Sequence, residues 1–294
     1  MCVANTRMKI YSHKHPKALS LIERIPEAAG KAKAMKLPYW IIAQDTDPLG
    51  IVIVGKEPIQ LTAPPGTPVA LVALEPSQAS SEDIPNFIST VIKLVTEKDL
   101  ANALATLPLN HREALKRFLQ AGFEEFDDYY DMSCQLTQHL ALTTELRFEP
   151  VKQDEVREWF STATRFLAGS ADTALILALR YMPNLPDDFL NQYFTSEKLY
   201  FVAKGGKTIG ILDIHGTTGW IGNMGVDSQS RRKGYGRQIL IFALNQLQTR
   251  GCSKAGLRVH VDNKAAIQLY ESLGFKKKGR YKRLLWHNTK RPAS

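Results

Sequence analysis

The segment SRRKGYGRQIL, residues 230–240, places three consecutive cations beside two glycines. It follows the apolar stretch WIGNMGV and leads directly into an apolar helical pattern. A turn of this kind exposes backbone N–H groups at the positive end of a helix dipole, where a phosphate can bind. Gly234 and Gly236 let the backbone approach the anion, and the neighbouring cations add charge-assisted hydrogen bonds. The segment therefore predicts anion binding.

Two familiar phosphate loops are excluded by the spacing of the glycines. The segment has no Gly-x4-Gly-Lys-Ser/Thr pattern, so it is not a Walker A loop. It also lacks the third glycine of a dinucleotide-binding fingerprint. Taken alone, it is equally typical of a solvated basic turn.

A second motif, LRVHVDNKAAIQLYESLGF, lies about 25 residues downstream, a spacing that fits a helix, a loop and a strand. Its first part alternates as a strand, and its second part repeats apolar residues at helical spacing. Asn263 precedes the helix and suits an N-cap. Tyr270 suits a core aromatic residue with its hydroxyl at the rim. Each residue alone has this ordinary structural explanation.

Together the two motifs resemble the acyl-CoA site of the GNAT superfamily of N-acyltransferases, over roughly residues 146–290. The resemblance rests on Met224-Gly-Val-Asp-x3-Arg231-x2-Gly234-x-Gly236 followed by Leu257-x-Val259-x3-Asn263-x2-Ala266-x2-Leu269-Tyr270-x3-Gly274-Phe275. It implies acetyl-CoA as the acyl donor, with no metal. The implied cofactor-binding residues are Met224, Gly225, Val226, Arg231, Arg232, Lys233, Gly234, Tyr235, Gly236, Arg237, Asn263, Ala266 and Tyr270.

The resemblance also implies how the donor lies in the fold. A central sheet splays between strands 220–226 and 255–261, and CoA occupies the resulting V. The pyrophosphate sits on the amides of residues 232–237, and the pantetheine arm runs along Met224 and Val226. Tyr270 points at the sulfur.

The expected chemistry is direct attack of a neutral amine on the thioester in a ternary complex. Tyr270 is the candidate acid that returns a proton to the thiolate. The base is open: Asp213 and His215 share one face of the preceding strand, LDIHG. An ordinary structural explanation fits these residues equally well: Asp213 is a surface carboxylate with an ion-pair partner, and His215 is a turn residue. A chain of waters serving as the base also fits. His260 is expected to face away from Val259 and receives no role.

An internal repeat organises the chain. EALKRFLQAGFEEFDDYYDM, residues 113–132, echoes AAIQLYESLGFKKKGRYKRL, residues 265–284. Each is a helix, then Gly-Phe, then a charged strand-like stretch. The repeat predicts two similar α/β domains, 1–140 and 146–294, each with a central mixed, mostly antiparallel sheet flanked by helices.

Apolar periodicity and turn residues give the expected elements. The expected strands are residues 7–12, 39–45, 50–56, 69–75, 101–107, 145–151, 199–205, 208–216, 220–226 and 255–261. The expected helices are residues 18–35, 84–100, a helix at Glu113, helices across 154–181, and residues 236–248 and 264–273. The join is expected near residues 135–144.

The first half has lost the residues that would hold CoA. Alignment on the repeat puts Glu82 in the place of Gly234, with Asp83 next to it. These carboxylates repel pyrophosphate, and Pro85 removes an amide. Phe118 stands in the place of Tyr270. The first domain is therefore expected to be degenerate, either shaping the acceptor pocket or stabilising the sheet edge of the second domain.

Charge and composition limit the other functions. Residues 1–145 carry 14 Lys and Arg against 17 Asp and Glu, whereas residues 146–294 carry 24 against 12, within a net charge of +9. Three widely spaced cysteines, no apolar run of about 18 residues and no signal-peptide core lead us to expect a cytoplasmic protein without a membrane span. His13 and His15 have metal-like spacing, but nothing nearby completes a site.

The sequence thus predicts an N-acetyltransferase that acts on a primary amine of a small molecule, peptide or protein. One alternative is a non-catalytic acyl-CoA-binding or sensing protein, suggested by the missing base. Another is a nucleic-acid-associated protein, suggested by the basic segment KKKGRYKRLLWHNTKRP; CoA's phosphates explain that segment more economically. We expect a monomer or a homodimer.

Overall fold

The computed structural model describes residues 8–25, 30, 32, 36–58, 61–75, 79–181 and 184–291. The chain folds into two compact units. The first unit combines Met1–Asp127 with Tyr281–Ser294, and the second is Asp128–Arg280. No helix in the described part of the chain is both long enough and apolar enough to cross a membrane.

The first unit is built on a mixed sheet. Its strands follow the order β1 (Met8–Ser12), β2 (Tyr39–Gln44), β3 (Asp47–Lys56), β4 (Pro68–Leu74), β5 (Asn102–Pro108) and part of β12 (Lys276–His287). The pairs are antiparallel except β4 with β5. Its helices are α1 (Pro16–Ile22), α3 (Asp83–Glu97) and α4 (Arg112–Gln120). The expected helix over residues 18–35 falls partly outside the described residues.

The second unit repeats this plan. Its sheet order is β6 (Glu124–Gln135), β11 (Lys254–His260), β10 (Trp220–Val226), β9 (Lys207–His215), β8 (Lys198–Lys204) and β7 (Arg147–Pro150). Here β10 and β11 are the parallel pair. The helices are α5 (Val156–Leu167), α6 (Thr173–Tyr181), α7 (Asp187–Ser196), α8 (Tyr235–Thr249) and α9 (Lys264–Glu271), with short 3-10 turns at Gln153–Glu155 and Ser228–Ser230.

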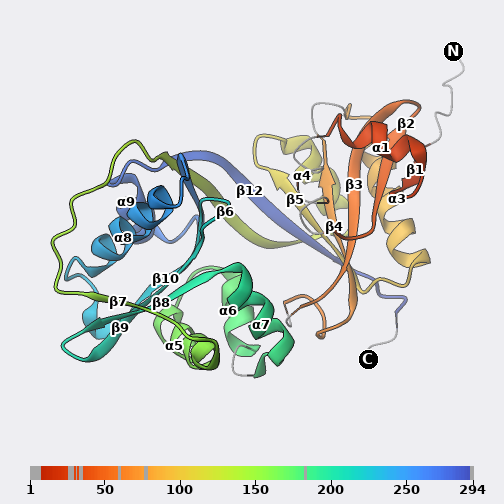
Figure 1. Ribbon diagram of the computed structural model, residues 1–294. Helices are drawn as coiled ribbons and strands as arrows, with labels where there is room; N and C mark the ends of the chain where they lie inside the picture. Colours follow the sequence, from red (N-terminus) through yellow and green to blue (C-terminus); the bar gives the residue numbers. More distant parts are fainter. Residues whose placement is uncertain are drawn as a thin grey trace, which may run out of the picture. The chain divides into compact units, whose positions relative to one another are not determined.

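Helices cover both faces of the second sheet. α5 and α8 each pack on β9 and β10, and Figure 1 shows them on opposite faces. Residues 209–214 of β9 are accordingly all buried, and all of them are apolar or glycine except Asp213. α7 lies beyond the helices expected across residues 154–181, and it supplies Tyr193 to the site described below.

The internal repeat is visible in the backbone. α4 and α9 are each followed by a glycine in the left-handed region, Gly122 at φ +89° and Gly274 at φ +87°. A phenylalanine comes next in both places and is buried. Each copy then enters its long strand, β6 or β12, so the two halves share one helix–glycine–strand plan.

The long strands β6 and β12 each pair with the sheet of the other half of the chain. Residues 129–135 of β6 pair with β11 of the second unit. Residues 281–287 of β12 pair with β5 of the first unit. The units therefore differ from the sequential domains 1–140 and 146–294: residues 128–140 fold with the second unit, and residues 281–291 fold with the first.

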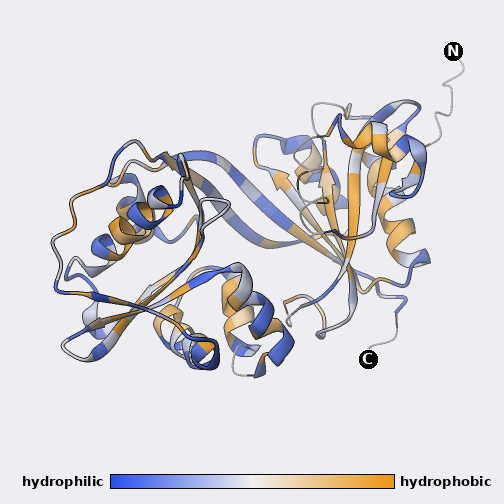
Figure 2. Ribbon diagram, viewed as in Figure 1, coloured by the Kyte–Doolittle hydropathy of each residue, from blue (hydrophilic) through white to orange (hydrophobic). Residues whose placement is uncertain are grey.

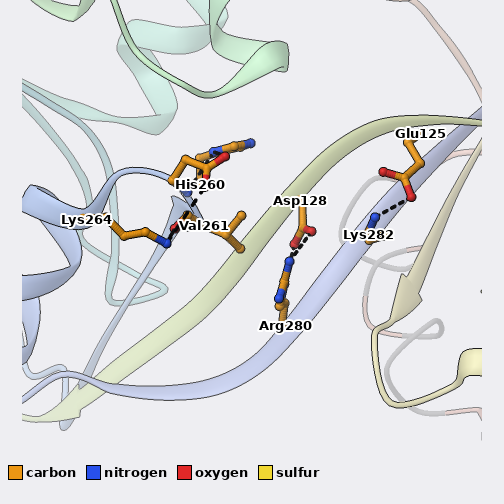
Figure 3. Close-up of polar contacts among 8 residues, drawn as sticks. Glu125, Asp128, His260, Val261, Lys264, Arg280 and Lys282 are labelled. Atoms are coloured by element: carbon orange, nitrogen blue, oxygen red, sulfur yellow. Dashed lines mark hydrogen bonds and ion pairs between the residues drawn. The ribbon is translucent and has the colours of Figure 1, made fainter.

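Ion pairs link β6 to β12 within each unit. Arg280 binds Asp128 with two hydrogen bonds of 2.8 and 2.6 Å in the second unit. Lys282 pairs with Glu125 and Arg283 with Asp127 in the first (the Glu125 and Asp128 pairs are drawn in Figure 3). Figure 2 shows both strands as largely hydrophilic, in contrast to the apolar β3 and β4. Much of the basic C-terminal segment is therefore neutralised by neighbouring carboxylates.

The strand pairing predicts how fragments behave. A fragment of residues 146–294 loses β6, including the buried side chains of Met132 and Cys134 that belong to the second core. We expect it to lack a cooperative thermal transition, because one edge of β11 and part of the core become exposed. Circular dichroism melting beside the full chain tests this. A fragment that melts as sharply as the full chain would contradict the expectation.

Candidate active site

The central feature of the second unit is the separation of β10 from β11. These parallel strands share a single registered pair, Trp220 with Gly256. The equivalent strands of the first unit, β4 and β5, share four, from Ala70–Ala103 to Ala73–Thr106. β10 and β11 thus diverge beyond Trp220, as the resemblance implied. Unpaired strand edges leave backbone N–H and C=O groups free to bind another molecule.

A cavity of about 500 Å³ lies along this divergence. Its walls come from the loop after α5, from β10, from the end of β11 and from α9. Six of the expected cofactor-binding residues line it: Met224, Gly225, Val226, Arg231, Asn263 and Tyr270. The remaining seven lie outside its lining: Arg232, Lys233, Gly234, Tyr235, Gly236, Arg237 and Ala266.

The glycine turn at the end of β10 has the backbone that an anion site needs. Gly234 adopts φ +80° and forms the N-cap of α8 without a side chain over the first amides. A Cβ on Gly234 would meet nothing within 4 Å, so the approach to this turn is open. Arg232 also lies in the left-handed region, at φ +60°. The start of α8 therefore presents bare N–H groups.

The side chain of Arg231 is fixed by two hydrogen bonds to backbone carbonyls. Its Nε donates to the carbonyl of Val226 at 3.0 Å and its Nη2 to the carbonyl of Phe166 at 2.7 Å. It thereby ties the end of β10 to the end of α5 across one wall of the cavity. The guanidinium of Arg237 bonds to Ser272 at 2.9 Å.

Asn263 and Tyr270 both line the cavity, and each also has a structural role. The Oδ1 of Asn263 accepts from the backbone N–H of Ala266 at 3.2 Å, which makes it the N-cap of α9. Tyr270 packs against Phe275, with ring centroids 5.8 Å apart. Burial of its hydroxyl raises the pKa of Tyr270 to about 12. The phenol therefore stays protonated at neutral pH and can donate a proton.

The cavity also contains residues that the motifs did not single out. Trp220, Asn223, Arg258 and His260 line it, although His260 was given no role. Arg258 bonds to Asp131 at 2.9 Å and lies over the rings of Tyr129 and Trp220. The sequence could have indicated these four residues only through their place on the two strands that diverge.

Asp213 and His215, the proposed bases, lie outside the cavity lining. Asp213 is completely buried, and its Oδ2 accepts from the Tyr193 hydroxyl at 2.9 Å and from Asn223 Nδ2 at 2.7 Å. Burial raises the pKa of Asp213, and hydrogen bonds from Asn223 oppose the rise. This carboxylate is not in direct contact with the cavity; it touches Asn223, which is.

His215 contacts a second buried carboxylate, Glu197. Glu197 is only 4% exposed, and burial, reinforced by the charge of Asp213, raises its pKa to about 8. Burial lowers the pKa of His215. Both groups of this contact are therefore uncharged at neutral pH, and the charge of Asp213 acts on the same glutamate. Glu197 is the first residue after α7 and has no recognisable motif around it.

Other histidines serve the first unit. His15 Nδ1 accepts from the backbone of Lys17 at the start of α1. His13 packs against the rings of Tyr39 and Trp40. Within the described residues, no group of three or more His, Cys, Asp and Glu side chains could hold a metal ion.

Residues 154–275 match the Acetyltransferase (GNAT) family. This part of the chain is a GNAT domain. The chain resembles the [Ribosomal protein bS18]-alanine N-acetyltransferase of Salmonella typhimurium, with 47% identity over 53 residues, 18% of this chain and 36% of that enzyme. It also resembles the mycothiol acetyltransferase of Thermobispora bispora, with 31% identity over 127 residues, 43% and 35% of the two chains. The chain thus spans about a third of the curated relatives it matches.

Two solved structures share the fold over almost the whole chain. A GCN5-related N-acetyltransferase from Sphaerobacter thermophilus has a TM-score of 0.63 at 14% identity, covering 95% of each chain. A tandem GNAT protein from the clavulanic acid biosynthesis pathway has a TM-score of 0.64 at 13% identity, covering 96% of this chain and 98% of that one. The expected fold class and the GNAT resemblance are confirmed.

The first unit differs from the second at the equivalent position, where a smaller cavity of about 320 Å³ lies beside Leu74, Ile84 and residues 110–114. Its parallel strands remain paired, and Phe118 is fully buried against Phe123. Asp83 turns its carboxylate onto the backbone N–H and the hydroxyl of Ser80, at 3.0 and 2.6 Å. The carboxylate of Asp83 thus accepts hydrogen bonds from loop groups that could otherwise bind an anion. Residues 76–78 of the same loop lie outside the described part.

These differences predict a single donor site in each chain. We expect calorimetric titration of CoA to give one equivalent per chain, because only the second unit combines diverging strands with an open glycine turn. Gly234→Asp should abolish that binding by placing a carboxylate on the turn and straining its positive φ. Two equivalents, or binding that survives Gly234→Asp, would contradict this assignment.

The raised pKa of Glu197 predicts a dependence of stability on pH. Between about pH 4.5 and 8 the folded state holds a proton on Glu197 that the unfolded state has released. Stability should therefore fall as pH rises through this window, by at most ~1.4 kcal/mol per pH unit.

Glu197→Gln should flatten this fall, whereas Glu158→Gln, at an exposed position of α5, should leave it unchanged. Urea unfolding at pH 5, 6.5 and 8 measures the slopes. Equal slopes for the wild type and Glu197→Gln would show that Glu197 titrates normally.

Proposed function

We propose that this protein is an N-acetyltransferase that transfers the acetyl group of acetyl-CoA to a primary amine. The observation that carries the proposal is the cavity along the divergence of β10 and β11, which is lined by Tyr270 and by Arg231, three residues before the open turn at Gly234. A phosphate-bearing donor with an amide-containing arm fits both features. The turn offers N–H groups to the phosphates, and the edge of β10 offers backbone partners to the arm.

The relatives support an amine as the acceptor. One name describes N-acetylation of an alanine of a ribosomal protein, and another, from Xenopus laevis and 39% identical over 57 residues, describes N-alpha-acetylation. Both names place the acetyl group on a nitrogen atom. We propose a primary amine as the shared acceptor chemistry for this chain.

The proposed reaction proceeds in a ternary complex. The nitrogen lone pair of the neutral amine attacks the thioester carbonyl carbon, the carbon–sulfur bond breaks, and acetylamine and CoA leave. A backbone N–H of β10 stabilises the charge that develops on the carbonyl oxygen. Tyr270, which stays protonated, donates its proton to the departing sulfur. The proton lost by the amine passes to water, because the buried Asp213 does not line the cavity, and water returns a proton to the Tyr270 phenolate.

Tyr270→Phe provides the direct test of this mechanism. We expect kcat to fall about 100-fold or more while the Kd for CoA changes little, because the ring and its packing are kept and only the proton donor is removed. Thiol release from acetyl-CoA with a panel of amines gives kcat, and calorimetry gives Kd.

Tyr200→Phe is the matched control, since Tyr200 is a buried tyrosine of the same unit outside the cavity. Full activity of Tyr270→Phe would remove Tyr270 from the mechanism. Tight CoA binding without turnover of any amine by the wild type would refute the enzyme itself.

A further inference from the structure

Asn223 occupies an unusual place on β10. The pairing of β10 with β9 shifts register between Ile221 and Met224, so that Gly222 and Asn223 form a bulge. Both residues line the cavity. Bulges commonly redirect a side chain out of the regular alternation of a strand. Here the redirected side chain is an amide beside the point where the strands diverge.

The contacts of Asn223 fix which way its amide faces. Its Nδ2 donates to Asp213 Oδ2 at 2.7 Å and to the Tyr193 hydroxyl at 3.2 Å, which accounts for both of its hydrogens. The Tyr193 hydroxyl in turn donates to the same carboxylate oxygen at 2.9 Å. The three groups form a closed ring of hydrogen bonds. Among the described residues, none bonds to Oδ1 of Asn223, which is the acceptor left over.

The surroundings hold this ring rigidly. Tyr193 packs against Phe160 and Phe189, with ring centroids 5.0 and 6.0 Å away. Asp213 is fully enclosed, and a Cβ on Gly222 would lie 1.8 Å from its Oδ1, so only glycine fits there. An amide held against a buried carboxylate is polarised, and its carbonyl oxygen becomes a stronger acceptor.

We propose that Oδ1 of Asn223 accepts a hydrogen bond from the amine of the acyl acceptor and that Asp213 and Tyr193 are positioning residues for this amide. A primary amine can give one N–H to Oδ1 and still present its lone pair to the thioester. This inference rests on the proposed acetyltransferase function and names the residue that recognises its acceptor.

The test compares acceptor and donor kinetics in the full-length protein, using the best amine found in the acetyl-CoA panel. Asn223→Ala should raise the KM for the amine about 10- to 100-fold and leave the Kd for CoA within twofold. Tyr193→Phe keeps the ring packing but loses the hydroxyl, and it should raise the same KM by a smaller factor. Asn191→Ala, an exposed asparagine of α7, is the control and should change neither value.

A purely structural role for the ring would lower thermal stability and CoA affinity together, without a selective rise in the KM for the amine. That result, or an unchanged KM in Asn223→Ala, would overturn the inference while leaving the acetyltransferase intact. A wild-type protein that acetylates no amine would overturn both.

Discussion

The site depends on the loss of backbone pairing between β10 and β11 beyond Trp220. A parallel pair normally satisfies its N–H and C=O groups along its whole length. Where the strands part, those groups become binding groups instead. The first unit has the same connectivity with the pairing retained, so topology alone does not create the site.

Several local contacts hold β10 where the strands diverge. The bulge at Gly222 and Asn223 shifts the register of β10 against β9, and buried Asp213 holds the side chain of Asn223. Arg231 ties the far end of β10 to the carbonyl of Phe166. At the pair where β10 and β11 still meet, the ring of Trp220 lies against Gly256, where a Cβ would come within 2.9 Å. These contacts join β10 to different elements, and Trp220, Asn223 and Arg231 all line the cavity.

The sequence predicted those parts of the fold and site that depend on neighbouring residues. The glycine turn and the Asn263–Tyr270 helix were predictable because phosphate cradles, caps and helix faces are encoded within one or two turns of chain. The exchange of β6 and β12 was not, because the alternation within a strand does not name its partner. Glu197 was missed for a similar reason, since burial beside Asp213 and His215 depends on the packing of α7, β8 and β9.

One long-range signal was nevertheless present in the charges. Residues 124–131 hold five carboxylates, and the matching stretch of the repeat, residues 276–283, holds six cations. The pairs Arg280–Asp128, Lys282–Glu125 and Arg283–Asp127 join these two stretches, more than 150 residues apart. The contrast between an acidic first half and a basic second half therefore arises partly from strands that neutralise each other. The two stretches are copies of one strand with opposite charges. Their charges therefore indicate that the basic stretch pairs with the acidic stretch of the same chain, more directly than with a nucleic acid.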